Sequence, residues 1–244
     1  HNCRGQKMDF DDRDAFPPCP PYRRCSKKIV ALRFFGVENF RIENIVIQDQ
    51  KRYAMLMGNF RNVFIDGVSI PLEHLIPDTN QDGLHFHGPG KNLSIKNVRG
   101  RGGDDLIALN SDEGDGKGSI DNVLIDGVYA ENATQVLRML DYNDGALENV
   151  TIRNIHGTFM SFGFYIVPWF EGKGGRLKNI LIEDIRLRQT DHFYKYTNPF
   201  LFRLGGRIDD ITIKDISIDS DDKDFLFLEV QKAKSDIDPE KDVK

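Results

Sequence analysis

A short sequence pattern recurs seven times in this chain, and no other feature limits the possible folds so strongly. Each copy begins with Asn or Asp, continues with an apolar residue, a variable residue, Ile and a second variable residue, and then has Asn, Asp or Gly before Ile or Val. The copies begin at Asn39, Asn62, Asn92, Asn122, Asn149, Asn179 and Asp210. Their starts are 23, 30, 30, 27, 30 and 31 residues apart, a spacing that indicates a repeat architecture.

Within each copy, apolar and polar residues alternate, as in a β-strand with one buried face. A second apolar run lies between successive copies, so each repeat contains at least two short strands and no helical pattern. These runs cover residues 53–57, 84–87, 106–109, 136–140, 164–167, 200–204 and 225–229. The pattern predicts an all-β fold, a parallel β-helix of about seven coils stacked about 4.8 Å apart. One interior column should then contain Ile42, Ile65, Ile95, Ile125, Ile152, Ile182 and Ile213.

The repeats divide the chain into three expected parts. Residues 1–28 lack the pattern and are expected to form an irregular arm, residues 29–230 the β-helix, and residues 231–244 a charged tail. A solenoid that begins at residue 29 would expose strand edges, so we expect that further N-terminal coils precede it in the natural protein. The Asn at the start of most copies is expected to form hydrogen-bonded ladders at the turns, a structural role.

Composition excludes several kinds of partner. The formal net charge is −5 at pH 7, which makes nucleic acid and anionic membrane surfaces poor candidates. No run of about 18 apolar residues is present, so no membrane span is expected. The hydrophobic content of 39% excludes a mostly disordered chain. We also expect the protein to be a monomer.

Acidic residues precede the second strand in two neighbouring coils. Asp82 lies in the sequence Asn-Gln-Asp-Gly, and Asp104 and Asp105 follow about one coil later. Stacking should therefore bring these carboxylates onto one exposed groove, where the next coil supplies Arg138. Neighbouring carboxylates shift one another's pKa, and a pair of differently tuned carboxyls is what glycoside hydrolysis needs. Asp-Gly sequences also occur at ordinary turns of this chain, so both interpretations stay open on spacing alone.

Taken together, the two acidic motifs resemble those of the polygalacturonase-type (pectinase) glycoside hydrolases. That family carries Asn-Thr-Asp-Gly and, about one coil later, Asp-Asp before a short apolar strand and Asn-Ser. The resemblance covers residues 29–230 and implies a right-handed parallel β-helix that cleaves a pectin-like polysaccharide with inversion. It implies Asp104 as the general acid, and Asp82 and Asp105 as the residues that hold and deprotonate the water. It also implies action without a metal or cofactor, by a secreted or periplasmic protein.

The chain departs from the family pattern in two places. The family's Gly-His-Gly motif is absent between Ser111 and Arg138, and His85 or His87 could replace it. The family's Arg-Ile-Lys appears as Arg-Met-Leu, which keeps Arg138 for the substrate but lacks the Lys. His85 and His87 share one face of a strand, where they could bind sugar hydroxyls, tune the acids or be ordinary surface residues. As metal ligands they would need a third partner, which the sequence does not show.

Two aromatic residues are further candidates for substrate binding. Trp169 follows a strand two coils after Asp104 and could stack on a sugar ring, or could pack under the neighbouring Gly-rich loop. Tyr165 is expected on the same side of the solenoid. Two other functions remain possible from the sequence: a polysaccharide lyase with an acidic Ca²⁺ site, and a non-catalytic or degenerate β-helix that binds carbohydrate.

Overall fold

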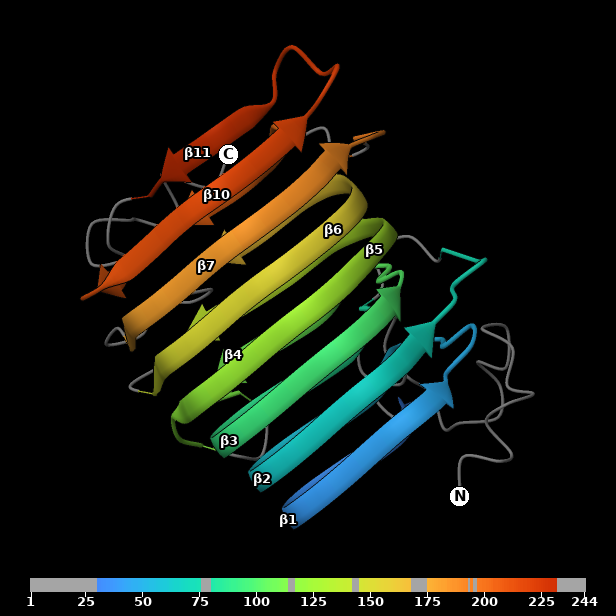
Figure 1. The fold of residues 1–244 in the computed structure, drawn as a ribbon, viewed down its shortest axis with the longest axis vertical. Coiled ribbons are helices and arrows are strands. Elements are labelled where there is room, and N and C mark those ends of the chain that lie inside the picture. Colours follow the sequence, from blue (N-terminus) through green and yellow to red (C-terminus); the bar gives the residue numbers. More distant parts are fainter. Residues whose placement is uncertain are drawn as a thin grey trace, which may run out of the picture.

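The computed structural model describes residues 30–75, 80–113, 117–141, 145–167, 175–192, 194 and 197–231. The arm expected over residues 1–28 and almost all of the tail expected over 231–244 lie outside the described residues. The described part forms an all-β solenoid of parallel strands without a helix (Figure 1). Its strands are β1 (Val30–Val46), β2 (Tyr53–Ile70), β3 (Leu84–Gly100), β4 (Asp105–Ser111), β5 (Ile120–Asp141), β6 (Ala146–Ile166), β7 (Arg176–Gln189), β8 (Phe200–Leu204), β9 (Arg207–Ile208), β10 (Ile211–Asp219) and β11 (Leu226–Val230).

The seven copies of the sequence pattern form seven parallel rungs, β1, β2, β3, β5, β6, β7 and β10, which lie side by side in Figure 1. Their register pairs the central isoleucines one after another: Ile42, Ile65, Ile95, Ile125, Ile152, Ile182 and Ile213. The five inner members of this column have no exposed surface, whereas the two end members are only half-buried. The predicted interior column is confirmed.

The solenoid makes about five turns, slightly fewer than the seven coils expected. All seven copies nevertheless form rungs, and the end rungs β1 and β10 each pair on one side only. The parallel β-helix class itself is confirmed.

A second face of the solenoid is built from the second apolar run of each repeat. The long strands β5 and β6 continue through a corner, marked by register shifts at Ala133, and so belong to both faces. On the second face, β4 pairs with β3 and with the end of β5, and β8 pairs with the end of β6 and with β11. The candidate site residues lie along this second face.

Asn residues turn the chain at the corner that precedes six of the seven central isoleucines. At the six positions where Asn begins a copy, φ lies between 53° and 59°, in the left-handed region that Asn tolerates better than most residues. The side-chain amides also form the expected ladder: Asn62 donates to Asn39, Asn92 to Asn62, Asn122 to Asn92 and Asn179 to Asn149, at 2.7–2.9 Å. Asn149 instead donates to Asp121, at 2.7 Å.

Replacing Asn92 should separate its two contributions to stability. Asn92→Ala should place an Ala at positive φ, which costs about 1–2 kcal/mol, and also removes the ladder hydrogen bonds. Asn92→Gly keeps the backbone conformation without that strain, so it should be the less destabilising change. Urea unfolding of both variants measures the difference. Equal or greater destabilisation by Gly would contradict a conformational role for Asn92.

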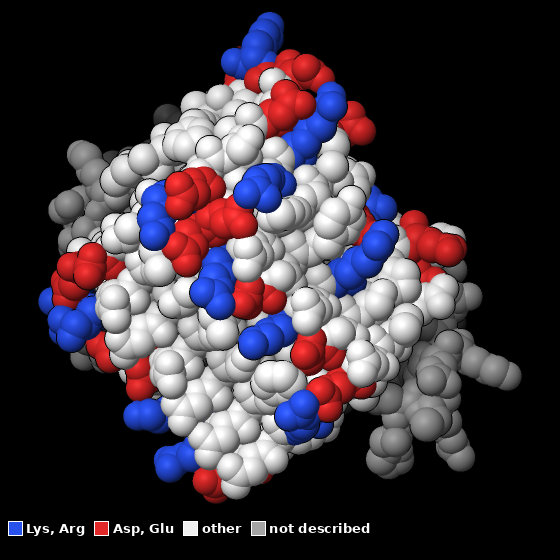
Figure 2. Space-filling view, viewed as in Figure 1, with Lys and Arg blue, Asp and Glu red and all other residues white. Residues whose placement is uncertain are grey.

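The sheet of seven rungs carries charges of both signs on its outer surface. Figure 2 shows Lys and Arg interspersed with Asp and Glu over this face. Several pairs bridge neighbouring rungs, such as Arg153 with Asp126 at 2.8 Å and Lys214 with Glu183 at 2.9 Å. Exposed pairs of this kind contribute little to stability. Among the described residues, no helix is long and apolar enough to cross a membrane.

Candidate active site

The two acidic motifs lie on neighbouring rungs of the second face. Leu84 pairs with Ile107, so continuing the register back by two residues aligns Asp82 with Asp105. The spacing of 22 residues between Asp82 and Asp104 in the sequence predicts instead that these two residues align. The structure shifts this alignment by one residue, because Leu84 and Ile107, the first residues that pair on these rungs, are 23 positions apart.

Gly83 allows these two rungs to approach closely. Its N–H donates to the carbonyl of Asp105 at 2.8 Å, and a Cβ atom at this position would lie 2.4 Å from the carbonyl oxygen of Leu106. No other residue fits there without moving the backbone. The Asp-Gly sequence therefore does more than make a turn, since the Gly packs the rung of Asp82 against that of Asp105.

The three carboxyl groups of Asp82, Asp104 and Asp105 are largely buried, and their charges shift one another's pKa. Asp82 has no exposed surface, Asp105 is 8% exposed and Asp104 is partly exposed. Burial, and next the negative charge of Asp82, raise the pKa of Asp104 to about 7, although Arg138 opposes the rise. Burial, then Asp104 and Asp82, raise the pKa of Asp105 well above its usual value. The structure therefore brings Asp82, Asp104 and Asp105 together. They do not lie on the exposed groove expected, because Asp82 and Asp105 are buried and only Asp104 is partly exposed.

His85 connects Asp82 to residues of the neighbouring rungs. Its Nδ1 lies 2.5 Å from Asp82 Oδ2, and its Nε2 lies 3.3 Å from Glu113 Oε2 and 3.1 Å from Asn110 Nδ2. Burial alone would lower the pKa of His85, but its hydrogen bonds to Asp82 and Glu113 raise that pKa well above 6.5. The ring of Tyr53, on the preceding rung, lies 4.7 Å from that of His85. His85 therefore holds a defined position behind Asp82.

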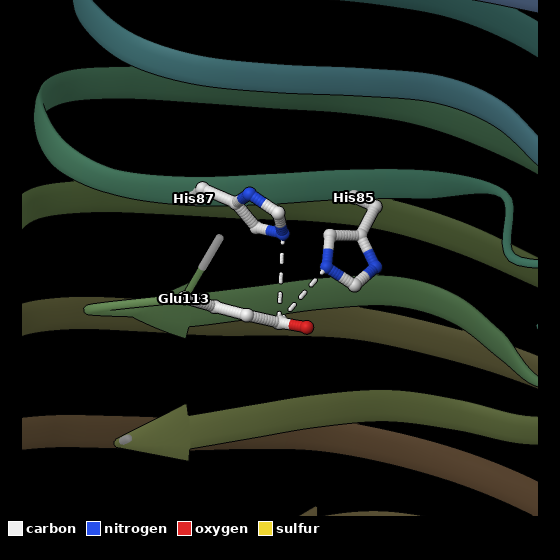
Figure 3. A group of neighbouring side chains, drawn as sticks. All are labelled: His85, His87 and Glu113. Carbon is white, nitrogen blue, oxygen red and sulfur yellow. Dashed lines mark hydrogen bonds and ion pairs between the residues drawn. The ribbon is translucent and has the colours of Figure 1, made fainter. Parts of the chain in front are cut away.

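His87 and His85 extend from β3 on the same side, and both face Glu113 (Figure 3). The intervening Phe86 is completely buried in the core, as the alternation of the strand predicts. His87 Nε2 lies 3.5 Å from Glu113 Oε2, and burial lowers the pKa of His87. The ligand atoms of the three residues all lie within 4.8 Å of one another, close enough for one metal ion. A second such group, formed by Asp49, Glu73 and His74, lies elsewhere and is mostly exposed.

Arg138 occupies the same ladder as His85, two rungs further along. Ala108 pairs with His85 and with Arg138, and Arg138 in turn pairs with Tyr165. The guanidinium carbon of Arg138 lies 3.9 Å from the centre of the Tyr165 ring, and one of its N–H groups donates to the carbonyl of Val167 at 3.3 Å. Arg138 is only 4% exposed, and its positive charge lowers the pKa of both Asp104 and Asp105.

Three site residues were missed by the sequence analysis. Glu113 lies in the 111–118 insert, which has no strand pattern, so no sequence signal places it beside His85 and His87. Arg52 donates to Asn80 Oδ1 at 2.9 Å, and the ring of Tyr53 lies against that of His85. Arg52 directly precedes the apolar run 53–57 and Tyr53 begins it, so neither residue stands out from the strand pattern. Aligning the rung of Asp82 with the preceding rung, as the pairing of Met55 with Leu84 does, would have pointed to both residues. Trp169 lies outside the described residues.

This arrangement suits proton transfer to and from a substrate. A carboxyl group with a pKa near 7 is protonated in mildly acidic water and can still release its proton, which a general acid must do. Groups with strongly shifted pKa values beside specific charged partners, here two further carboxyls and an arginine, are frequent at functional sites.

Comparison with known proteins identifies the family. A family model described as glycosyl hydrolases family 28 matches residues 3–238 of this chain. The chain belongs to glycosyl hydrolases family 28. This chain is also 25% identical, over 192 residues, to the exopolygalacturonase of clone GBGA483 from Arabidopsis thaliana. The match covers 75% of the family 28 chain and 40% of the plant protein, so the chain spans less than half the length of this relative. No solved structure gives a significant match. The polygalacturonase-type resemblance of the two acidic motifs is thus confirmed at the level of the family.

Proposed function

We propose that this protein is a pectin-degrading glycoside hydrolase that cleaves its substrate by an inverting acid/base mechanism. The observation that carries the proposal is the partly exposed Asp104, whose pKa is raised to about 7 next to Asp82 and Asp105. Membership of family 28 and the similarity to an exopolygalacturonase support the reaction type and the substrate class. A pectic substrate is extracellular, so the protein would act outside the cell.

Asp104 would serve as the general acid. It is the most accessible carboxyl of the trio, so a glycosidic oxygen can approach it. Its raised pKa keeps the proton on the carboxyl until the bond to the leaving group begins to break. The proton then moves from Asp104 to the leaving-group oxygen as the bond from that oxygen to the anomeric carbon breaks.

Asp82 and Asp105 would hold the attacking water and take its proton. Oδ2 of Asp82 is bonded to His85, whereas its buried Oδ1 has no hydrogen-bond partner among the described residues and can accept a bond from water. The water attacks the anomeric carbon from the side opposite the leaving group, which inverts its configuration. Arg138 would face a uronate carboxylate, with Tyr165, His85, His87 and Trp169 as further candidates for contacts with the sugar.

An assay of product chemistry tests this proposal. We expect the full chain to release reducing sugar from galacturonan, and to release less from a neutral polysaccharide, because Arg138 can pair with a carboxylate. Products that absorb in the ultraviolet would instead show elimination by a lyase. Absence of any product from a panel of pectic polysaccharides would contradict catalysis.

The pH dependence of kcat/KM should report the pKa of Asp104, and removing the neighbouring charge of Arg138 should shift it. The charged groups that act on Asp104 are Asp82, Arg138, His85 and Arg52. Because the acid must be protonated, kcat/KM should fall as the pH rises through about 7. Arg138 lowers the pKa of Asp104, so Arg138→Met should raise that pKa and move the fall to higher pH. Arg203→Met is the control, since Arg203 pairs with Glu229 at 2.7 Å further along the ladder. A fall at unchanged pH in Arg138→Met would count against Asp104 as the acid.

One observation favours a second candidate, carbohydrate binding without catalysis. Asp82 is completely buried and Arg138 is 4% exposed, so neither presents its charged group on an open surface. A binding protein would retain oligogalacturonide without releasing reducing ends, in both the natural chain and Asp104→Asn. Calorimetric binding combined with the product assay separates the two candidates.

A further inference from the structure

Acid/base cleavage of a glycoside gives no role to Glu113 or to its position facing both His85 and His87. Two imidazoles from β3 and one carboxylate from the segment after β4 converge on one point, with both imidazoles facing the carboxylate (Figure 3). We propose that these three side chains form a binding site for a transition-metal ion such as Zn²⁺. The site does not depend on the proposed hydrolase activity.

The spacing of the ligand atoms fits one ion. Zn²⁺ bonds to His nitrogen and carboxylate oxygen at about 2.0–2.2 Å in a tetrahedron, which places the ligand atoms about 3.3–3.5 Å apart. Glu113 Oε2 lies 3.3 Å from His85 Nε2 and 3.5 Å from His87 Nε2. Both distances exceed the roughly 2.7–2.9 Å of a charge-assisted hydrogen bond between nitrogen and a carboxylate. The two contacts are therefore long ion pairs whose lengths match two edges of a coordination tetrahedron. The same Glu113 Oε2 also accepts a hydrogen bond from the Asn110 amide.

His85 has the outer partner that a metal-bound histidine usually has. Its Nδ1 faces Asp82 Oδ2 at 2.5 Å and can donate its proton to this carboxylate, so Nε2 is the ring nitrogen at which a metal ion would replace the proton shared with Glu113. The same Nε2 points toward Glu113 and lies 3.1 Å from the Asn110 amide nitrogen, which is a donor. A carboxylate behind the imidazole fixes the tautomer and the ring orientation in many metal sites. Asp82 would hold His85 in this way.

Two buried atoms beside Glu113 make no hydrogen bond to another described residue. His87 Nε2 and Asn110 Oδ1 are buried without a hydrogen-bond partner among the described residues. Buried polar atoms of this kind are few in folded proteins and call for an explanation. A metal ion bound to Glu113 would also satisfy His87 Nε2, and Asn110 Oδ1 lies on the rung next to His87, to which Asn110 is paired.

The donor set determines which ions fit. Two imidazole nitrogens and one carboxylate oxygen suit Zn²⁺ and similar transition metals, whereas Ca²⁺ and Mg²⁺ prefer oxygen ligands alone. Three protein ligands leave one coordination position for water or a ligand oxygen. A bound ion would fasten the segment that carries Glu113 onto the rung that carries Asp82.

Metal titration of the full chain tests the site. After treatment with chelator and buffer exchange, we expect calorimetry to show binding of one Zn²⁺ ion, and Co²⁺ to give a visible absorption band. Loss of an outer partner of a metal ligand typically costs about 10–100-fold in affinity. His87→Ala and Glu113→Gln each remove a ligand itself, so each should weaken Zn²⁺ binding at least as much and abolish the Co²⁺ band. The control is His74→Ala, in the second group, where Asp49 already accepts the Glu73 N–H at 2.9 Å and the side chains are mostly exposed.

Zn²⁺ should also raise the melting temperature of the natural chain and of His74→Ala, but not that of Glu113→Gln, because only a ligand of the folded state stabilises it. Glu113→Gln is nearly isosteric and is the deciding variant if His87→Ala does not fold. No Zn²⁺ binding by the natural chain would overturn the proposal. Binding that survives Glu113→Gln and is lost in His74→Ala would overturn it as well.

Discussion

Asp104→Asn is expected to lower kcat/KM on a pectic polysaccharide by about 10²–10⁴-fold, the usual contribution of a positioned general acid or base. An amide cannot deliver a proton to a poor sugar leaving group, whereas the side chain keeps its size and position. Reducing-end release by purified variant and natural chain measures the loss. Asp121→Asn, on the exposed side of the sheet of seven rungs, controls for the loss of one carboxylate. Its amide oxygen can still accept the hydrogen bond of Asn149, so full activity is expected.

Leaving-group chemistry separates the roles within the trio. An aryl galacturonide with an activated leaving group needs little protonation, so Asp104→Asn should recover part of its loss on that substrate. Asp82→Asn and Asp105→Asn would impair the attacking water, and an activated leaving group should not rescue them. Equal behaviour of all three variants on both substrates would refute this assignment of roles.

Ile125→Ala should cost about 2–5 kcal/mol of unfolding free energy, because it opens a cavity in the middle of the isoleucine column. Ile125 has no exposed surface and lies between Ile95 and Ile152. Chemical denaturation followed by circular dichroism measures the change. Ile213→Ala is the matched control: it changes the same residue type in the same column, but on an end rung where the side chain is half-buried. The control should lose clearly less, and equal losses would mean that the column is not the core of the fold.

The repeat made the fold predictable from the sequence. A column of isoleucines and a ladder of Asn residues require only that successive copies stack in register, and the register follows from the pattern itself. Asn92 illustrates why: one residue type meets both the positive φ of the corner and the hydrogen bonding between rungs. Only the number of turns differed, about five against the seven expected.

The candidate site was less predictable because its details depend on packing between rungs. The sequence located Asp82, Asp104 and Asp105 on adjacent coils, but the true alignment of Asp82 with Asp105 depends on where the strands begin to pair. The burial of Asp82 also could not be predicted, since a polar residue beside Gly is normally exposed at a turn. Glu113 reaches the site from an insert without periodicity, and only the folded chain places it beside His85.

The trio also illustrates a conflict between stability and function. Burying several carboxyls together raises their pKa values, because the charged forms lose solvation and repel one another. A structural core would gain from apolar residues at these positions. The retained cluster, with Arg138 beside it, is therefore better explained by chemistry than by folding.

The stereochemistry of the first product tests the central claim most directly. Proton NMR during hydrolysis of a galacturonide oligomer by the full chain should show first the sugar with the anomeric configuration opposite to that of the bond cleaved. The signal should be strongly reduced in Asp104→Asn. First appearance of the retained configuration, or of an unsaturated sugar, would contradict the inverting acid/base mechanism proposed for Asp82, Asp104 and Asp105.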